Sequence, residues 1–144
     1  MKRQEFWELL ELLDWAQVGN DDAVLEPVVN YLSKHGDDEI FAFDDIMSEL
    51  LFDIDGKKYA ESVYANLEDL SEDDFLYTRC IAIVNGEGYY KAIKTHQSKL
   101  QADLEFESVL YVPELAWERR HGETAEYPHI AAYDYETGAN KNNW

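Results

Sequence analysis

The amino-acid sequence predicts an all-α fold, a single irregular bundle of about six to seven helices with an extended C-terminal tail. Apolar residues recur at intervals of three and four along most of the 144-residue chain, and this is the spacing of one helix face. Residues that begin or end helices stand between these stretches. Strict alternation of apolar and polar residues, which indicates strands, is nearly absent.

The first two helices are predicted from an amphipathic pattern and from the residues at its ends. Residues 3–17 place apolar side chains on one face and acidic side chains between them, which predicts a helix over that range. A second helix is predicted to begin after a cap at Asn20 or Asp21 and to end at Gly36. Pro27 falls inside it, which predicts either a kink or a later start.

Three further helices are predicted before residue 87. Asp37 begins the third helix, which ends before Gly56, and the fourth is predicted over residues 59–67. Ser71, with Asp74 three residues later, resembles a capping box and opens the fifth helix.

The last predicted helices lie on either side of a polar connector. Residues 87–96 are predicted to form a sixth helix, and a seventh is predicted from Pro113 to Gly122, because proline suits the first turn and glycine the end. Residues 1–122 are therefore interpreted as the helical domain. Residues 123–144 have no helical period and are predicted to form an extended tail, either flexible or packed in part through Tyr127, Ile130 and Tyr133.

Composition indicates a domain with its own core in a reducing compartment. Ten Tyr, six Phe and four Trp supply large apolar surfaces, and the single cysteine, Cys80, cannot form an internal disulfide. Acidic residues interrupt the N-terminal stretch where a signal peptide needs an apolar core, and no apolar run reaches a membrane span. A soluble cytoplasmic protein is expected.

Net charge is the strongest compositional signal. Twelve Lys and Arg stand against 31 Asp and Glu, which leaves a formal charge of −19. Residues 1–78 carry −16 and residues 79–144 carry −3. Direct binding to nucleic acid or to an anionic membrane is not expected, because both need a basic surface. The acidity either keeps the protein soluble or attracts a basic partner.

Arg79 stands in the middle of the most apolar predicted helix, residues 72–84. A helix that is apolar nearly all round is a central one, so the Arg79 side chain is predicted to be largely buried. A buried guanidinium needs a carboxylate and several carbonyl partners. Arg79 is therefore predicted to form a structural buried ion pair. The alternative is an anion-binding or catalytic arginine in a cleft with Tyr77.

Five stretches resemble, in order, the bacterial family catalogued as domain of unknown function 4240: "EFWELLELLDW", "DDEIFAFDDIMSELL", "SEDDFLYTR", "NGEGYYKAI" and "FESVLYVPELAWERRHG". The resemblance covers about residues 5–122. It implies an uncharacterised all-helical domain that includes the arginine at position 79, and it implies no catalytic residues. The family commonly has an aromatic residue before this arginine and tryptophan two residues after it, whereas this chain has Thr78 and Ile81.

Signatures of metal and catalytic sites are missing. The four histidines lie far apart in sequence, and the stretch "DIDGKK" lacks ligands at the ends of a calcium loop. Cys80 sits in an apolar helix with no local base to activate it. No cofactor, no metal and no catalytic residue is predicted.

The acidic pairs are the remaining candidate site. Most fall at helix starts, where carboxylates interact favourably with the helix dipole, so each pair by itself has a structural explanation. Their sum predicts an acidic face that binds a basic protein. The residues of this predicted face are Asp21, Asp22, Asp37, Asp38, Glu39, Asp44, Asp45, Asp53, Asp55, Asp73 and Asp74.

Three functions remain open at this point. The first hypothesis is a non-catalytic protein-binding domain, in its most concrete form an immunity protein that neutralises a basic toxin such as a nuclease. The second is an enzyme or small-molecule sensor with a pocket around Arg79 and Tyr77, which requires an open polar cleft. The third is a generic adaptor that selects its partner by shape.

Overall fold

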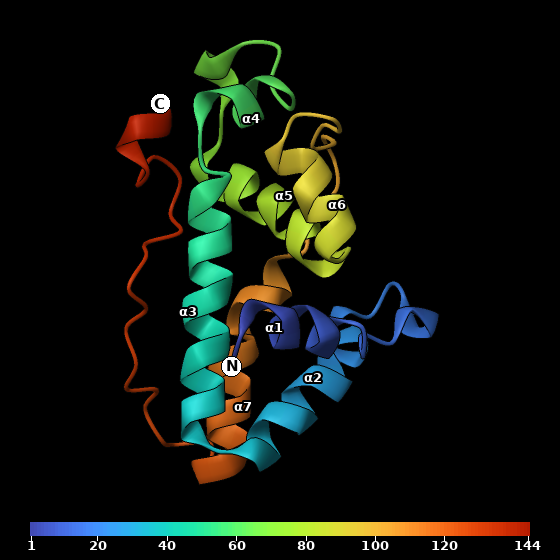
Figure 1. Ribbon diagram of the computed structural model, residues 1–144, viewed down its shortest axis with the longest axis vertical. Helices are drawn as coiled ribbons and strands as arrows, with labels where there is room; N and C mark the ends of the chain where they lie inside the picture. The colour runs from blue at the N-terminus through green and yellow to red at the C-terminus, as the bar shows by residue number, and fades with distance from the viewer. The chain divides into compact units, whose positions relative to one another are not determined.

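The all-α prediction is confirmed. The computed structural model describes all 144 residues and contains seven α-helices, four short 3-10 turns and no strands. The α-helices are α1 (Arg3–Leu10), α2 (Asp21–His35), α3 (Asp37–Asp53), α4 (Lys57–Glu61), α5 (Glu72–Val84), α6 (Glu87–Lys94) and α7 (Val112–His121) (Figure 1).

The chain forms two compact units, each built from two separate stretches of sequence. The first unit contains residues 1–46 and 108–131, and the second contains residues 47–107 and 132–144. Helix α3 contributes its N-terminal part to the first unit and its C-terminal end to the second. Residues far apart in sequence therefore meet within each unit.

In the first unit, α2 packs against α7. Phe6 of α1 and Phe43 of α3 have no exposed surface, and their ring centroids lie 4.9 Å apart. Burial of each such side chain contributes about 1.5–3 kcal/mol to the free energy of unfolding. These aromatic residues join the N-terminal helix to α3.

In the second unit, α5 is the central helix, as its composition predicts. Nine of its residues are buried, and these are Phe75, Leu76, Thr78, Arg79, Cys80, Ile81, Ala82, Ile83 and Val84. The neighbouring α6 buries Tyr90, whose hydroxyl donates a hydrogen bond of 2.6 Å to the carbonyl of Leu50 in α3.

Two predicted helices are shorter than expected because polar side chains start new turns. Helix α1 ends at Leu10, and the carboxylate of Asp14 then accepts a bond of 3.2 Å from the backbone N–H of Ala16, which begins a 3-10 turn. Helix α4 ends at Glu61, and the side chain of Asn66 caps a second 3-10 turn in the same way. Hydrogen bonds of this kind, from a backbone N–H to a nearby side chain, compete with the backbone hydrogen bonds that would continue the helix.

Other predicted boundaries hold. The side chains of Asn20 and Ser71 accept bonds of 3.2 and 3.3 Å from the third backbone N–H after them, and so cap α2 and α5. Pro113 lies in the first turn of α7. Gly122 ends that helix with φ +109°, a conformation that favours glycine.

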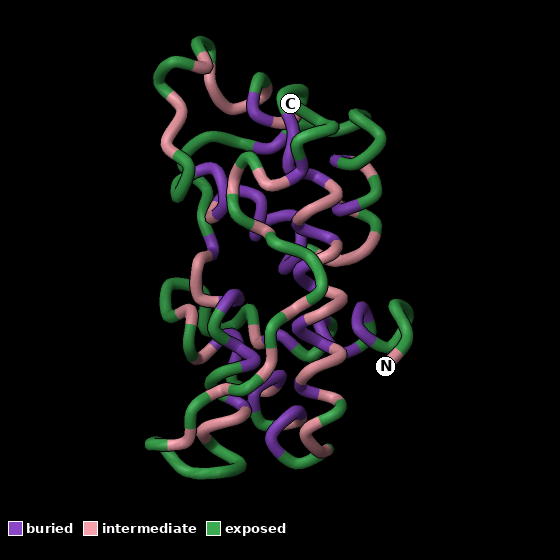
Figure 2. Tube along the Cα trace, turned by 90° about the vertical axis from the view of Figure 1, so that its left-hand side faces the viewer, coloured by how far each residue is buried: buried purple, intermediate pink, exposed green.

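Residues 123–144 contain no α-helix, and Figure 2 shows this segment as mostly intermediate or exposed. The Tyr133 ring lies 5.1 Å from the Phe52 ring. The prediction that Ile130 packs is wrong, because its side chain is 91% exposed. Burial alternates from residue to residue here, with His129 and Ala131 partly buried, and in an extended chain neighbouring side chains point to opposite sides.

Candidate functional site

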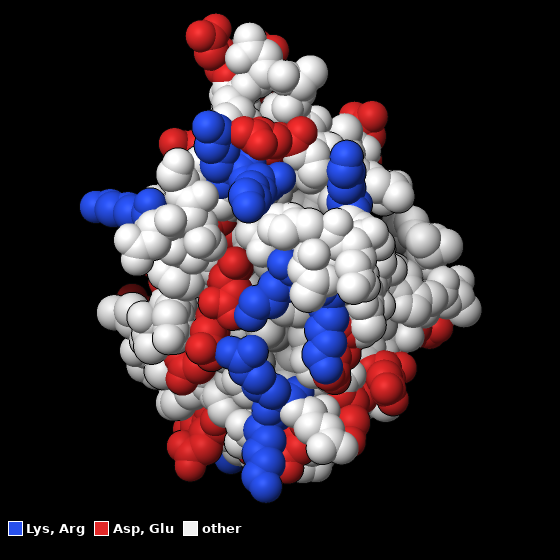
Figure 3. Space-filling model, turned by 45° about the horizontal axis from the view of Figure 1, so that its top comes forward, with Lys and Arg blue, Asp and Glu red and all other residues white.

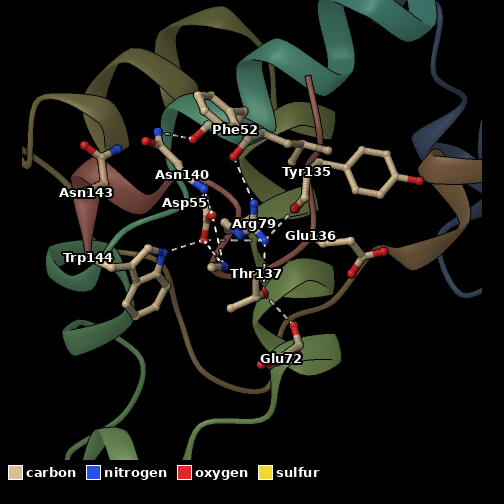
Figure 4. Close-up of polar contacts among 12 residues, drawn as sticks. Phe52, Asp55, Glu72, Arg79, Tyr135, Glu136, Thr137, Asn140, Asn143 and Trp144 are labelled. Carbon is tan, nitrogen blue, oxygen red and sulfur yellow. Dashed lines mark hydrogen bonds and ion pairs between the residues drawn. The ribbon is translucent and has the colours of Figure 1, made fainter. Parts of the chain in front are cut away.

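Arg79 is fully buried in the second unit, where its guanidinium donates three hydrogen bonds (Figure 4). Nη1 donates to the carbonyl of Leu51 at 2.9 Å, and Nη2 donates to the carbonyl of Tyr135 at 2.9 Å and to Oγ1 of Thr137 at 3.1 Å. The carboxylate of Asp55 lies 4.0 Å from Nη2, and its side chain is also fully buried. The C-terminal segment therefore supplies two of the three bonded oxygens.

Asp55 is bound by the same segment. Its carboxylate accepts hydrogen bonds of 3.0–3.1 Å from the backbone N–H groups of Gly138 and Asn140 and from the indole N–H of Trp144. The sequence prediction placed Asp55 on an exposed acidic face, and this is wrong. Three donors and the nearby Arg79 hold its charge inside the fold, where an ionised carboxylate needs them.

Burial lowers the pKa of Arg79, and the nearby Asp55 carboxylate acts in the opposite direction. The Phe75 ring lies 4.9 Å below the guanidinium, which adds a cation–π contact. Nε is buried with no hydrogen-bond partner. Since Arg79 has no exposed surface, a ligand pocket around Arg79 and Tyr77 would require this part of the second unit to open.

In the first unit, α7 pairs with one residue of the predicted acidic face, Asp37, and with one further acid, Glu26. Asp37 accepts bonds from His121 Nε2 at 2.7 Å and from Arg120 Nε at 2.9 Å. The pKa of Asp37 is lowered, and the bond from His121 is the largest cause; burial opposes it, and the Arg120 guanidinium lowers the pKa by a smaller amount. The carboxylate of Glu26 in α2 receives two bonds from the Arg119 guanidinium, at 2.5 and 2.9 Å.

The segment after α7 binds two more acids of the predicted face. The Tyr127 hydroxyl donates a bond of 2.8 Å to Asp44, which is itself buried, and His129 Nε2 lies 2.7 Å from Asp45. Burial and the bond to Asp44 raise the pKa of Tyr127. These carboxylates are already bound within the fold.

The remaining predicted residues divide between the two units. In the first unit, Asp21, Asp22 and Asp38 make no ion pair, and Glu39 lies 3.6 Å from the amine of Met1. The others lie in the second unit, where Asp53 pairs with Lys94 at 3.2 Å and Asp73 and Asp74 occupy the first turn of α5.

The charge gradient along the sequence is not a gradient between the units. The first unit carries 16 acids and five bases, a net charge of −11, and the second carries 15 acids and seven bases, a net charge of −8. The difference is small because residues 108–131 join the N-terminal helices and bring Arg119 and Arg120 with them. Net charge therefore does not distinguish one unit from the other as the binding surface.

One such surface is an acidic groove of about 570 Å³ in the first unit. No Lys or Arg lines it, and its walls combine carboxylates with apolar groups. The lining residues are Met1, Glu5, Glu8, Leu9, Leu12, Tyr31, His35 and Glu39. The rings of Tyr31 and His35 stack with centroids 3.8 Å apart.

Three exposed apolar side chains lie at the groove or in the connection between α1 and α2. Leu12, which lines the groove, is 48% exposed, and Trp15 and Val18 in the α1–α2 connection are 41% and 76% exposed. We name these three residues, together with the acids near them in sequence, the docking face. These acids are Glu5, Glu8, Glu11, Asp14, Asp21 and Asp22.

Sequence reasoning missed the glutamates of α1 as part of a binding surface. Glu5 and Glu8 lie on the side of α1 opposite the buried residues Phe6 and Leu10, and Glu11 directly follows the helix; all three are exposed. The signal was present as acids at intervals of three, but the same pattern is expected of any solvent-facing helix surface.

The structure groups no three His, Cys, Asp or Glu side chains in a way that could hold a metal ion. Burial raises the pKa of Cys80 to about 12, so its thiol is protonated at neutral pH. None of the helices combines the length and the apolar character needed to cross a membrane.

Comparison with known proteins identifies a family. Residues 1–119 match the model of the family described as "Protein of unknown function (DUF4240)", which confirms the resemblance seen in the sequence. No curated protein and no solved structure matches the chain.

Proposed function

We propose that this chain, which belongs to the DUF4240 family, is a non-catalytic binding protein whose first unit docks onto a basic protein. In its most concrete form, it is a cytoplasmic immunity protein that neutralises a basic toxin such as a nuclease. The proposal rests mainly on the docking face, where exposed apolar side chains stand in sequence among acids that form no ion pair in the structure.

A surface of this composition has the features of a protein interface. Aromatic and aliphatic side chains at the centre of an interface provide most of the binding free energy, and charged residues at its rim select the partner and speed association. Trp15 and Leu12 are suited to the first role. Glu8 and Glu11 are suited to the second because each is exposed and neither forms an ion pair.

The groove favours a lysine or arginine side chain of the partner. The methylene groups of such a side chain can lie against Leu9 and Leu12, while its charged end meets Glu5 or Glu8. A nuclease must carry a basic surface to bind phosphates. If the carboxylates of this chain covered that basic surface, the nuclease could not bind its nucleic-acid substrate.

The first step is to examine the reading frames next to that of this chain for one that encodes a secreted basic nuclease; its absence would count against the proposal. The protein found there is then purified. Stopped-flow association of the two purified proteins is measured at low and at high salt, together with nuclease activity. Inhibition is expected, with an association rate that falls steeply as salt rises. An association rate that does not change with salt would remove the electrostatic argument.

A pair of charge-matched variants tests whether the docking face is the surface used. Glu8→Gln with Glu11→Gln removes two carboxylates from that face, whereas Glu68→Gln with Asp69→Asn removes two exposed carboxylates from the second unit. The first double variant should slow association several-fold more than the second. Equal effects would indicate that only net charge matters, as expected of an acid-rich protein without a defined interface.

A further inference from the structure

The second unit contains a pocket whose charge is opposite to that of the whole chain. Its volume is about 380 Å³, within the range of small-molecule sites. It is formed by α4 with the residues just after it, by α6 and by the segment that follows α6. The lining residues are Lys58, Tyr59, Glu61, Ser62, Ile93, His96, Ser98, Lys99 and Leu100.

Lysines are concentrated around this pocket. Figure 3 turns the part of the second unit that carries α4 and α6 toward the viewer, and it shows several Lys and Arg side chains there with Asp and Glu side chains between them. Five of the twelve basic residues of the chain belong to α4, α6 and the segment after α6; these are Lys57, Lys58, Lys91, Lys94 and Lys99.

The two lysines that line the pocket are the ones without an acidic partner. Lys57 pairs with Glu61 at 3.8 Å, Lys91 with Glu87 at 2.5 Å and Lys94 with Asp53 at 3.2 Å. Lys58 and Lys99 make no ion pair and no side-chain hydrogen bond, although the chain contains 31 acids. Their charges are available to a ligand.

A histidine held in a fixed place completes the basic wall. His96 adopts φ +61°, which is uncommon for a residue other than glycine. Its ring stacks on that of Tyr59 with centroids 4.7 Å apart and an angle of 26° between the planes. Tyr59 is itself fixed, because its hydroxyl donates a bond of 3.0 Å to the carbonyl of Lys94.

We propose that this pocket binds the phosphate group of a small phosphate monoester. The ammonium groups of Lys58 and Lys99, the imidazole of His96 and the hydroxyl of Ser98 provide donors for the phosphate oxygens. The buried side chains of Ile93 and Leu100 give an apolar wall for the organic part of the ligand. Glu61, the one acid in the lining, is paired with Lys57 and can accept a hydrogen bond from a ligand hydroxyl.

The test is a titration of the full chain followed by two-dimensional amide NMR. The probes are inorganic phosphate, ribose 5-phosphate and unphosphorylated ribose. Phosphate and ribose 5-phosphate are expected to shift the amide signals of Lys58 and of residues 96–99 at low millimolar concentration, with tighter binding of the sugar phosphate. Ribose alone should shift none of them. Absence of shifts with both phosphates, or equal shifts with ribose, would overturn the proposal.

Two charge-matched double variants distinguish phosphate binding in the pocket from nonspecific electrostatic attraction of phosphate to the second unit. Lys58→Gln with Lys99→Gln should weaken ribose 5-phosphate binding by at least about fivefold, the loss expected for charge-assisted contacts at a partly exposed site. Lys91→Gln with Lys141→Gln removes equal charge from the same unit without touching the lining. Equal weakening in both would overturn the proposal. The first pair should leave binding of a basic nuclease unchanged, so this result is independent of the proposed function.

Discussion

The carboxylate of Asp55 and the guanidinium of Arg79 lie 4.0 Å apart, and neither side chain has any exposed surface. Each is bound mainly by groups that lie more than 50 residues away in sequence, in the segment from Tyr135 to Trp144. This segment therefore binds both members of the buried pair, although most of its own residues are intermediate or exposed.

Removing Asp55 should cost far more stability than removing Arg79. Asp55→Ala leaves three donors without an acceptor and removes the carboxylate that lies 4.0 Å from the buried Arg79 cation, which keeps its three hydrogen bonds. We expect the free energy of unfolding to fall by about 3–5 kcal/mol. Arg79→Met leaves the Asp55 carboxylate with the three hydrogen bonds from Gly138, Asn140 and Trp144. Urea denaturation measures both. An equal loss for Arg79→Met would show that these three bonds do not support the carboxylate alone.

Gly56 should not tolerate a methyl group, because a Cβ atom there would lie 2.8 Å from Cβ of Asn143 and 3.1 Å from its carbonyl oxygen. Gly56→Ala is expected to displace the C-terminal turn and to cost about 1–3 kcal/mol. Gly88→Ala in α6 is the matched control, since nothing lies within 4 Å and alanine favours helix by about 1 kcal/mol. Thermal melting should therefore move in opposite directions for the two variants, and a rise in the melting temperature of Gly56→Ala would contradict the packing described.

The contacts of Asp37 should make stability depend on pH. Its pKa is lowered in the folded state, chiefly by the bond from His121, so it binds a proton more readily when unfolded. The stabilisation is present above about pH 4, the unfolded pKa, and is lost as pH falls through the lower folded pKa.

A neighbouring residue provides the control for this pH effect. Asp37→Asn should lower stability at neutral pH by less than about 1 kcal/mol, because the pair is half exposed and screened by water. Asp38→Asn changes the same charge at a residue without a partner and should have no such effect. Melting temperatures recorded from pH 7 to pH 2 for both variants decide this, and parallel curves would count against the Asp37 contacts.

Cys80 should be unreactive in the native protein. Its pKa of about 12 and its full burial leave neither thiolate nor access for a reagent. We expect a thiol reagent at pH 8 to label the chain only in urea. Rapid stoichiometric labelling of the native protein would show that α5 becomes exposed through frequent opening of the second unit.

The helices could be predicted from the sequence, because their signals are local. Asn20, Ser71 and Gly122 mark boundaries through bonds and backbone conformations within a few residues. Apolar residues around Arg79 indicated a buried position, where the structure places it. Nothing in the sequence identified Asp55, among 31 acids, as the buried carboxylate near Arg79, because the residues that bind Asp55 lie in a segment without a helical pattern.

The acidic face was harder to predict for a related reason. The sequence order suggested that charge gathers in the first 78 residues, but α7 and the residues after it fold back within the first unit and pair with Glu26, Asp37 and Asp45. Pairing between distant positions cannot be inferred from one sequence. The exposed state of Leu12 and Trp15 also depends on where α1 ends, which local capping decided.

The interleaved order of the two units bears on synthesis of the protein. Residues 47–107 leave the ribosome long before residues 132–144, which supply the donors for Asp55 and two acceptors for Arg79. During that interval, the Asp55 carboxylate and the Arg79 guanidinium of the nascent chain must remain solvated. In the folded protein both are buried. The second unit is therefore expected to reach its folded form only after residues 132–144 have been synthesised.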